Sequence, residues 1–176
     1  MNDVPGPTKR LFFRHWRAED LPLAFALWCD ARVATFIGGP LTQAQARLRL
    51  EEQLESQRQH GFQYWPIFLR DGGEHVGCCG LRPRNPEQRI LEIGFHLRPE
   101  YWGKGYATEG ARRVAEHAFS KLGARSLFAG HHPENLSSRR TLEKLGFRYS
   151  HDELYPPTGL RHPSYFLTSY FLTTPG

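Results

Sequence analysis

The sequence has no long apolar runs, and it holds only three cysteines among 176 residues. No segment approaches the roughly 18–20 apolar residues that a membrane-spanning helix requires, and residues 1–8 contain no apolar signal core. Cys29, Cys78 and Cys79 form neither an even disulfide framework nor a CxxC pair. We therefore predict a cytoplasmic protein with no membrane partner, and we interpret the cysteines as small buried residues rather than nucleophiles.

Motifs for several common chemistries are also missing. His131 and His132 are adjacent, but no HExxH motif or cysteine partner accompanies them, so we predict no metal site. The net charge of +5 and the pI of about 9.3 favour an anionic partner. A phosphorylated small molecule and RNA would both fit this charge. Because no strand motif with stacking aromatic residues accompanies the scattered arginines, nucleic acid is not the expected partner.

Hydrophobic periodicity and turn residues predict one α/β domain at residues 9–176, preceded by a flexible tail at residues 1–8. After the long helix, the next strand should lie parallel to the last strand of an antiparallel meander. We expect a mixed, mostly antiparallel, twisted sheet of about six or seven strands flanked by helices. The expected strands are 10–16, 63–69, 75–81, 90–97, 125–130, 147–149 and 164–172, and the expected helices begin near residues 20, 42, 107 and 135.

The stretch from Leu91 to Gly110 combines three features that create an anion-binding site. An alternating strand ends at Pro99, a turn with Gly103 and Gly105 follows, and a long helix with one apolar face begins directly after it. Glycine lets the backbone approach a ligand closely, and the helix dipole adds positive charge to the unpaired amides. The turn is neither a Walker A loop, which needs Ser or Thr after Gly-Lys, nor an early dinucleotide fingerprint. Main-chain binding of a phosphate-bearing cofactor is therefore the first interpretation.

Three motifs, in the order and spacing of one family, point to a particular cofactor. Trp102–Ala107, preceded by Glu92–Phe95 and followed by Asn135–Phe147, resembles the GNAT N-acetyltransferase superfamily. Within it, the sequence looks most like the branch of ribosomal-protein alanine and serine N-acetyltransferases, and the resemblance covers about residues 9–172. It implies a GNAT-like domain with a cofactor cleft between two central parallel strands. It also implies acetyl-coenzyme A as donor, no metal, and a primary amine (a protein N-terminal α-amine or a small-molecule amine) that attacks directly in a ternary complex.

The resemblance also assigns cofactor-binding residues. The pyrophosphate loop of the family maps onto residues 102–107, where Trp102 replaces the Gln or Arg of many members. The pantetheine arm is expected to run along residues 95–97 through main-chain hydrogen bonds, and Asn135 is expected to hold the same arm. The cofactor-binding set is Phe95, His96, Leu97, Trp102, Gly103, Lys104, Gly105, Tyr106, Ala107, Asn135 and Ser138.

Two residues are candidates for catalysis. Strand alternation places Glu92 and His96 on the same face, where this family often places a general base. Glu92 is the first choice and His96 the second, and the alternative is that Glu92 is a structural ion-pair partner. Many family members use a tyrosine at the position of Leu142 to protonate the leaving thiolate. This sequence instead offers Ser138, which is either that acid or an ordinary helix-start residue.

A different class of function also fits the sequence. A non-catalytic coenzyme A-binding or interaction module would keep the glycine turn and lose the chemistry. Leu142 favours that alternative, whereas Glu92 and Ser138 oppose it. If the protein is an enzyme, its base is either Glu92 or a water chain, and we expect a monomer or a homodimer.

Overall fold

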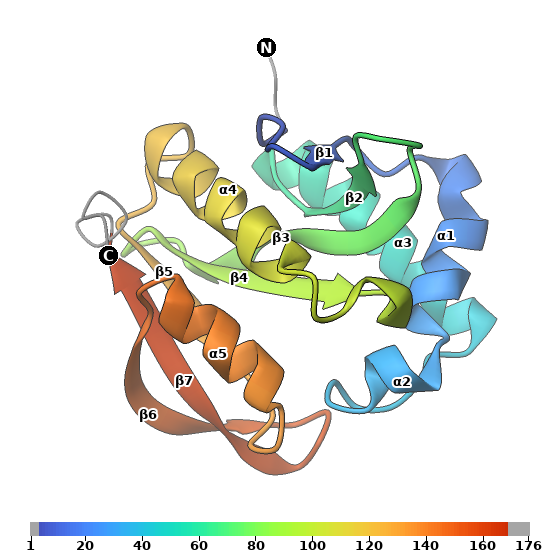
Figure 1. The fold of residues 1–176 in the computed structure, drawn as a ribbon. Helices are drawn as coiled ribbons and strands as arrows, with labels where there is room; N and C mark the ends of the chain where they lie inside the picture. The colour runs from blue at the N-terminus through green and yellow to red at the C-terminus, as the bar shows by residue number, and fades with distance from the viewer. Residues whose placement is uncertain (1–3, 169–176) are drawn as a thin grey trace.

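The computed structural model describes residues 4–168, which form one seven-stranded sheet flanked by helices (Figure 1). The strand order is β1-β2-β3-β4-β5-β7-β6, in which β4 and β5 are parallel and the other neighbouring pairs are antiparallel. This confirms the predicted mixed, mostly antiparallel sheet. The strands are β1 (Leu11–Phe13), β2 (Tyr64–Leu69), β3 (His75–Asn85), β4 (Ile90–Leu97), β5 (Ser126–Gly130), β6 (Arg148–Tyr155) and β7 (Leu160–Thr168). The helices are α1 (Leu21–Trp28), α2 (Ala31–Ala34), α3 (Gln43–His60), α4 (Tyr106–Ser120) and α5 (Leu136–Lys144), with short 3-10 helices at Ala18–Asp20 and Pro99–Tyr101.

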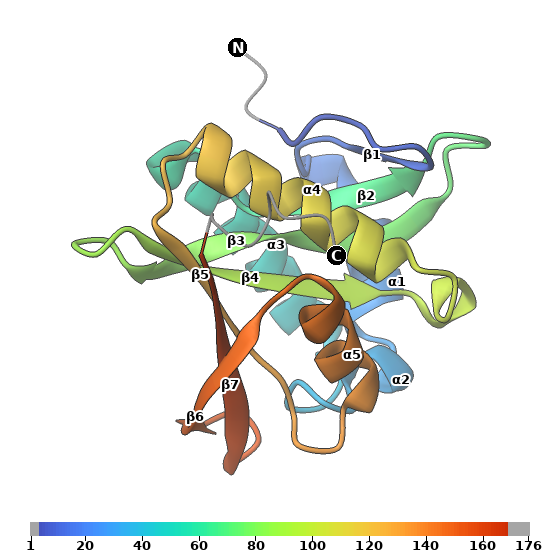
Figure 2. The ribbon, with the colours of Figure 1, turned by 60° about the vertical axis from the view of Figure 1, so that its left-hand side comes forward.

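The two parallel strands, β4 and β5, diverge after a short paired segment (Figures 1 and 2). Beyond Glu92, β4 continues to Leu97 beside β3, and β5 continues to Gly130 beside β7. The sheet is therefore split where the family resemblance predicts the cofactor. The paired positions are Ile90–Ser126, Leu91–Leu127 and Glu92–Phe128.

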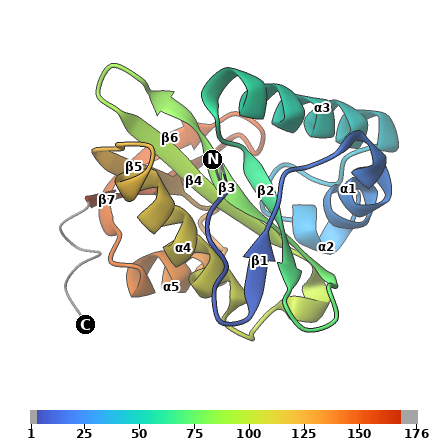
Figure 3. The same cartoon turned by 90° about the horizontal axis from the view of Figure 1, so that it is seen from above.

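The two faces of the sheet carry different helices (Figure 3). α4 and α5 cover one face, where Val114 belongs to the larger hydrophobic core, and α1 and α3 cover the other, where Trp28 belongs to a second core. Adjacent strand residues point to opposite faces, so Cys78 lies in the second core and Cys79 in the larger one. Both thiols are buried, as the sequence predicts.

Local sequence signals determine where the helices around the site begin and end. Thr42 and Gln45 form the predicted capping box of α3, and Gly61 ends that helix with a φ of 76°. Asn135 caps α5 by accepting a hydrogen bond from the Ser138 amide at 3.1 Å. These ends agree with the prediction because cap chemistry acts over only a few residues.

The described start of the chain contacts helix α4. Residues 1–3 lie outside the described part of the chain. In residues 4–8 of the predicted tail, Pro5 is buried and the Thr8 hydroxyl donates a hydrogen bond to the Glu109 carboxylate at 2.6 Å. Helix α4 therefore holds this segment against the domain.

The closing strands form a hairpin in which β6 is longer than predicted and β7 begins before the predicted start at residue 164. β7 inserts between β5 and β6, and the part of the predicted strand at residues 169–172 lies outside the described residues. Across residues 4–168, no helix is both long enough and apolar enough to cross a membrane.

Candidate functional site

The turn between β4 and α4 presents a row of unpaired amides. Gly103 and Gly105 have φ values of 70° and 81°, in the left-handed region that favours glycine. Gly105 is the N-cap residue, and the Glu109 amide donates to its carbonyl at 3.1 Å. Within residues 4–168, the amides of residues 103–107 donate no hydrogen bond. Such a helix start binds anionic groups, and it contains the predicted loop residues Gly103, Lys104, Gly105, Tyr106 and Ala107.

Arg10, just before β1, holds this turn in place. Its guanidinium donates to the Lys104 carbonyl at 2.9 Å and to the Glu109 carboxylate at 2.6 Å, and it lies 4.4 Å from the centroid of the Tyr106 ring. Burial disfavours the ionised form of Glu109, but hydrogen bonds from Thr8 and Arg10 outweigh burial and lower its pKa. Sequence reasoning missed this role of Arg10, because its partners lie 94 and 99 residues further along the chain.

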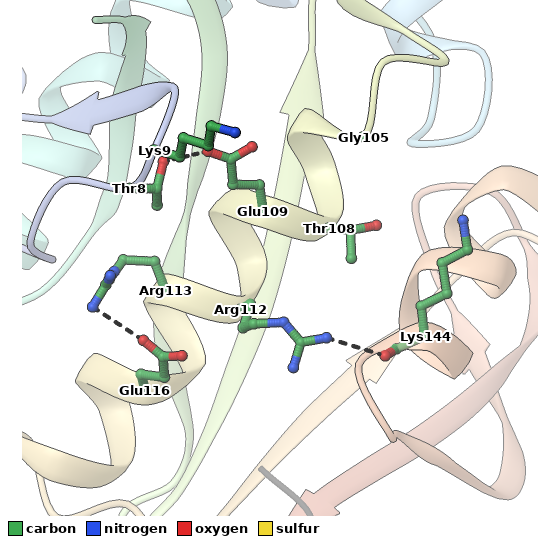
Figure 4. Close-up of a pocket in the computed structure, with 9 residues that line it drawn as sticks. All are labelled: Thr8, Lys9, Gly105, Thr108, Glu109, Arg112, Arg113, Glu116 and Lys144. Atoms are coloured by element: carbon green, nitrogen blue, oxygen red, sulfur yellow. Dashed lines mark hydrogen bonds and ion pairs between the residues drawn. The ribbon is translucent and has the colours of Figure 1, made fainter. Parts of the chain in front are cut away.

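A cationic pocket of about 500 Å³ lies beside the turn, between α4, the start of the chain and the end of α5 (Figure 4). The Arg112 guanidinium donates to the Lys144 carbonyl at 3.3 Å, which links α4 to α5. The two carboxylates that line the pocket are engaged by arginines. In the described part of the chain, three of its cations have no carboxylate partner: Lys9, Arg112 and Lys144.

The edge of β4 that faces the split presents the main-chain groups of alternate residues. The Arg98 amide donates to a β3 carbonyl at 2.9 Å, and main-chain groups alternate in direction along a strand. The main chain of His96 therefore faces β3, whereas Phe95 and Leu97 face the split. The Leu97 carbonyl already accepts a hydrogen bond from the Trp102 indole at 2.8 Å. This geometry narrows the predicted main-chain contacts from residues 95–97 to Phe95 and the Leu97 amide.

Asn135 and Ser138 lie at the start of α5, on the α4 face of the sheet. The Asn135 side-chain oxygen is used as the helix cap, which leaves its amide nitrogen as a donor. The Ser138 side chain is half-buried, and its hydroxyl makes no hydrogen bond to any described residue. Leu142, at the position of the family's tyrosine, is 1% exposed in the larger core. Ser138 therefore retains a free hydroxyl, and Leu142 has no group for proton transfer.

Glu92 occupies the last paired position of β4 and β5, on the face opposite α4. Its carboxylate pairs through Oε1 with Arg82, the residue directly across the register on β3. The Glu92 side chain is 14% exposed, and its Oε2 accepts no hydrogen bond from residues 4–168. This geometry is compatible with both predicted roles of Glu92, base and ion-pair partner.

His96 shares that face with Glu92, but its ring is a poor base. Trp28 Nε1 donates to His96 Nδ1 at 3.2 Å, which places the imidazole proton on Nε2. Burial, together with the charges of Arg49 and Arg82, lowers the pKa of His96 to about 3. The ring is therefore neutral near pH 7, which opposes the second choice for the base.

Tyr64 of β2 lies over the same face, and sequence reasoning missed it. Its hydroxyl sits so close to Gly94 that a Cβ there would collide with it, and its ring centroid lies 5.9 Å from that of His96. The hydroxyl makes no hydrogen bond within the described residues. No local sequence pattern reveals this contact, because it depends on the register in which Tyr64 pairs with Gly80 and Gly80 pairs with Gly94.

The adjacent histidines after β5 take part in packing. His131 is buried, with its Nδ1 2.8 Å from the His132 carbonyl and its Nε2 3.3 Å from the Tyr165 hydroxyl. The His132 ring lies 5.0 Å from Phe36 and 5.5 Å from His162. Within residues 4–168, no group of three or more His, Cys, Asp or Glu side chains could hold a metal ion.

Comparisons with known proteins agree with this geometry. Residues 10–148 match the acetyltransferase (GNAT) domain family. YoaA of Bacillus subtilis (strain 168), an uncharacterized N-acetyltransferase, is 30% identical over 145 residues, which cover 80% of this chain and 81% of YoaA. An acetyltransferase of the GNAT family from Bacillus anthracis has a TM-score of 0.77 at 24% identity, covering 90% of this chain and 93% of that chain. RimL, a ribosomal L7/L12 alpha-N-protein acetyltransferase in complex with coenzyme A, has a TM-score of 0.79 at 15% identity, covering 92% and 95%.

The fold and the site together define an α/β protein in which a helix N-terminus with unpaired amides lies beside a split sheet. The chain belongs to the GNAT acetyltransferase family, and its enzyme class is an acyltransferase that depends on acetyl-coenzyme A. This confirms the family, fold and enzyme class that the sequence motifs predict. The likeness to RimL shows a shared fold.

Proposed function

We propose that the protein transfers an acetyl group from acetyl-coenzyme A to a primary amine that binds on the Glu92 face of β4. The observation that carries this proposal is the meeting of three features at the split. They are the unpaired amides of residues 103–107, the free main chain of Phe95, and the Glu92 carboxylate at the last paired position. The acceptor is a protein N-terminal α-amine or a small-molecule amine.

The residues around the turn fit coenzyme A. The amides of residues 103–107 and the dipole of the 15-residue helix α4 provide donors and positive potential for a pyrophosphate. The Phe95 main chain and the Asn135 side-chain amide would hold the pantetheine arm between β4 and α5. The cationic pocket would hold the 3′-phosphate of the nucleotide through Arg112 and Lys144.

The bound cofactor supplies an activated acetyl thioester. The side chains of the protein remove a proton from the attacking amine and donate one to the departing sulfur. Glu92 accepts a proton from the amine at Oε2, directly or through water, while Arg82 holds Oε1. The Ser138 hydroxyl donates a proton or a hydrogen bond to the departing sulfur. Because Glu92 and α5 lie on opposite faces of the sheet, the acceptor can approach from one face and the cofactor from the other.

We propose direct attack by the amine, without an acyl-enzyme. Cys78 and Cys79 are buried, and burial raises the pKa of Cys78 to about 12, so neither thiol is an activated nucleophile at neutral pH. An acetylated enzyme that accumulates in a kinetic burst would contradict this mechanism.

Coenzyme A release over a panel of amines and N-terminal peptides tests the proposal. We expect turnover that falls by about 100-fold or more in Glu92→Gln, in the range that loss of a general base causes. Glu87→Gln is the matched control, because Glu87 is an exposed carboxylate in the turn between β3 and β4. Undiminished turnover in Glu92→Gln would remove Glu92 as the base. Tight cofactor binding without turnover on any acceptor would favour the coenzyme A-binding module, which Leu142 supports.

A further inference from the structure

Helix α3 directs one arginine toward the sheet face that carries Glu92 and His96. Arg49 is half-buried and lies beside Leu50, which is buried in the core under α3. The Arg49 guanidinium lies 5.5 Å from the centroid of the Trp28 ring, and Trp28 donates its indole hydrogen bond to His96. Arg49 is therefore separated from the His96 ring by a single indole.

Arg49 differs from the other half-buried arginines in the described part of the chain. Arg14, Arg98 and Arg113 each pair with a carboxylate, at 2.6, 3.1 and 3.1 Å. Arg49 has no hydrogen-bond acceptor or carboxylate partner among residues 4–168. Its guanidinium makes a cation–π contact with the Trp28 ring. The Arg49 guanidinium keeps its donors available for a ligand, and its planar fork matches a carboxylate, so this position favours an anionic ligand.

The charges on this face of the sheet do not cancel. Arg49 and Arg82 both act electrostatically on the same imidazole of His96, which places both guanidinium groups near it. The charge of Arg82 is matched by its ion pair with Glu92. Arg49 is left as an unmatched positive charge on the sheet face that carries both His96 and Glu92. The aromatic rings of Trp28 and Tyr64 lie on this face, and apolar surroundings strengthen the attraction between a cation and an anion.

We propose that Arg49 binds a carboxylate of the acceptor, so that the acceptor is a primary amine that also carries an acidic group. This rests on the proposed function, because Glu92 must receive the proton of the same molecule. A guanidinium binds a carboxylate through two parallel hydrogen bonds, which would orient the amine as well as attract it. The carboxylate belongs either to a free amino acid or to an acidic side chain near a peptide N-terminus.

Matched acceptor pairs test this inference. The first pair is a free amino acid and its carboxamide. The second pair is two peptides that differ only in carrying Asp or Asn at the second position. The first pair tests a free amino acid as the source of the carboxylate, and the second tests an acidic side chain near a peptide N-terminus. We expect kcat/KM to favour the anionic member of at least one pair by about tenfold or more. The ratio should fall to near one in Arg49→Gln and to an intermediate value in Arg49→Lys, which keeps the charge but loses the planar fork. The matched control is Arg47→Gln, an exposed arginine on the same helix, and it should keep the wild-type ratio.

A ratio is used because a general loss of folded protein cancels within each pair. A wild-type ratio near one in both pairs, or a ratio unchanged in Arg49→Gln, would overturn the role of Arg49. Equal turnover of charged and neutral amines would leave the proposed function intact. Calorimetric binding of the same pairs to the coenzyme A-loaded protein reads the preference without turnover. If no amine releases coenzyme A, the proposed function fails, while a binding preference lost in Arg49→Gln would still support the anion site.

Discussion

Replacing Arg10 with alanine removes the side chain that fixes the turn between β4 and α4. The substitution deletes the hydrogen bond to the Lys104 carbonyl at 2.9 Å, the ion pair with Glu109 at 2.6 Å and the stacking on Tyr106 at 4.4 Å. The main-chain hydrogen bond from residue 10 to Glu109 is kept, because alanine retains its amide. The variant should therefore fold and should lose order mainly in the turn.

The size of the effect follows from these contacts. A hydrogen bond to a charged group contributes about 1.5–3 kcal/mol. The Arg10 side chain is 41% exposed, so solvent screening reduces the sum of its contacts to about 1.5 kcal/mol. Because the amides of residues 103–107 must be ordered before they can bind a pyrophosphate, this free energy should appear as weaker binding. We expect the Kd for coenzyme A to rise roughly tenfold.

Isothermal titration calorimetry with coenzyme A measures this change. Arg58→Ala is the control, since it removes an exposed arginine–glutamate pair on α3 away from the turn and should leave the Kd within about twofold. A Kd for Arg10→Ala within about twofold of the wild-type value would refute the argument that Arg10 preorganises the turn.

Acid should destabilise the fold, because His75 is buried and burial lowers its pKa from 6.5 to about 4. The unfolded state then binds the proton first, so urea unfolding should show full stability above pH 6.5 and about 2 kcal/mol less at pH 5. His75→Phe should flatten this dependence, and an unchanged pH profile would contradict the assignment. Gly94→Ala should lower the midpoint of thermal unfolding, because the added Cβ would collide with the Tyr64 hydroxyl. Adding Tyr64→Phe should recover part of this loss. A Gly94→Ala protein as stable as the wild type would exclude the clash. Ser138→Ala should lower kcat about tenfold or more in single-turnover kinetics, and full activity would remove its hydroxyl from proton transfer.

Features that depend on local chemistry could be predicted from the sequence. The capping box of Thr42 and Gln45 and the cap at Asn135 act within a few residues, so their patterns identify helix ends directly. The turn at Gly103 and Gly105 requires left-handed backbone that favours glycine, so the glycine pattern predicts the turn that we propose as the anion site. The alternation of β4 predicts that Glu92 and His96 share one face, and the structure places that face opposite α4.

Contacts between distant segments could not be predicted in the same way. The ion pair between Arg10 and Glu109 joins residues that lie 99 positions apart in the sequence, and no local pattern links them. The pair of Arg82 with Glu92 depends on the register of β3 against β4, and one residue of slip would put the two side chains on opposite faces. The position of Arg49 over Trp28 depends on how α3 packs on the sheet. Arg49 and Tyr64 could therefore be recognised only from the fold, whereas the glycine turn that we propose binds the cofactor could be predicted from the sequence.

A crystal structure with coenzyme A tests the central claim most directly. The claim is that the turn before α4 binds the pyrophosphate and that the split between β4 and β5 holds the pantetheine arm. We predict phosphate oxygens within about 3.2 Å of the amide nitrogens of residues 103–107, with the arm hydrogen-bonded to the Phe95 main chain. A pyrophosphate bound away from these amides, or an arm that lies outside the split, would contradict the account.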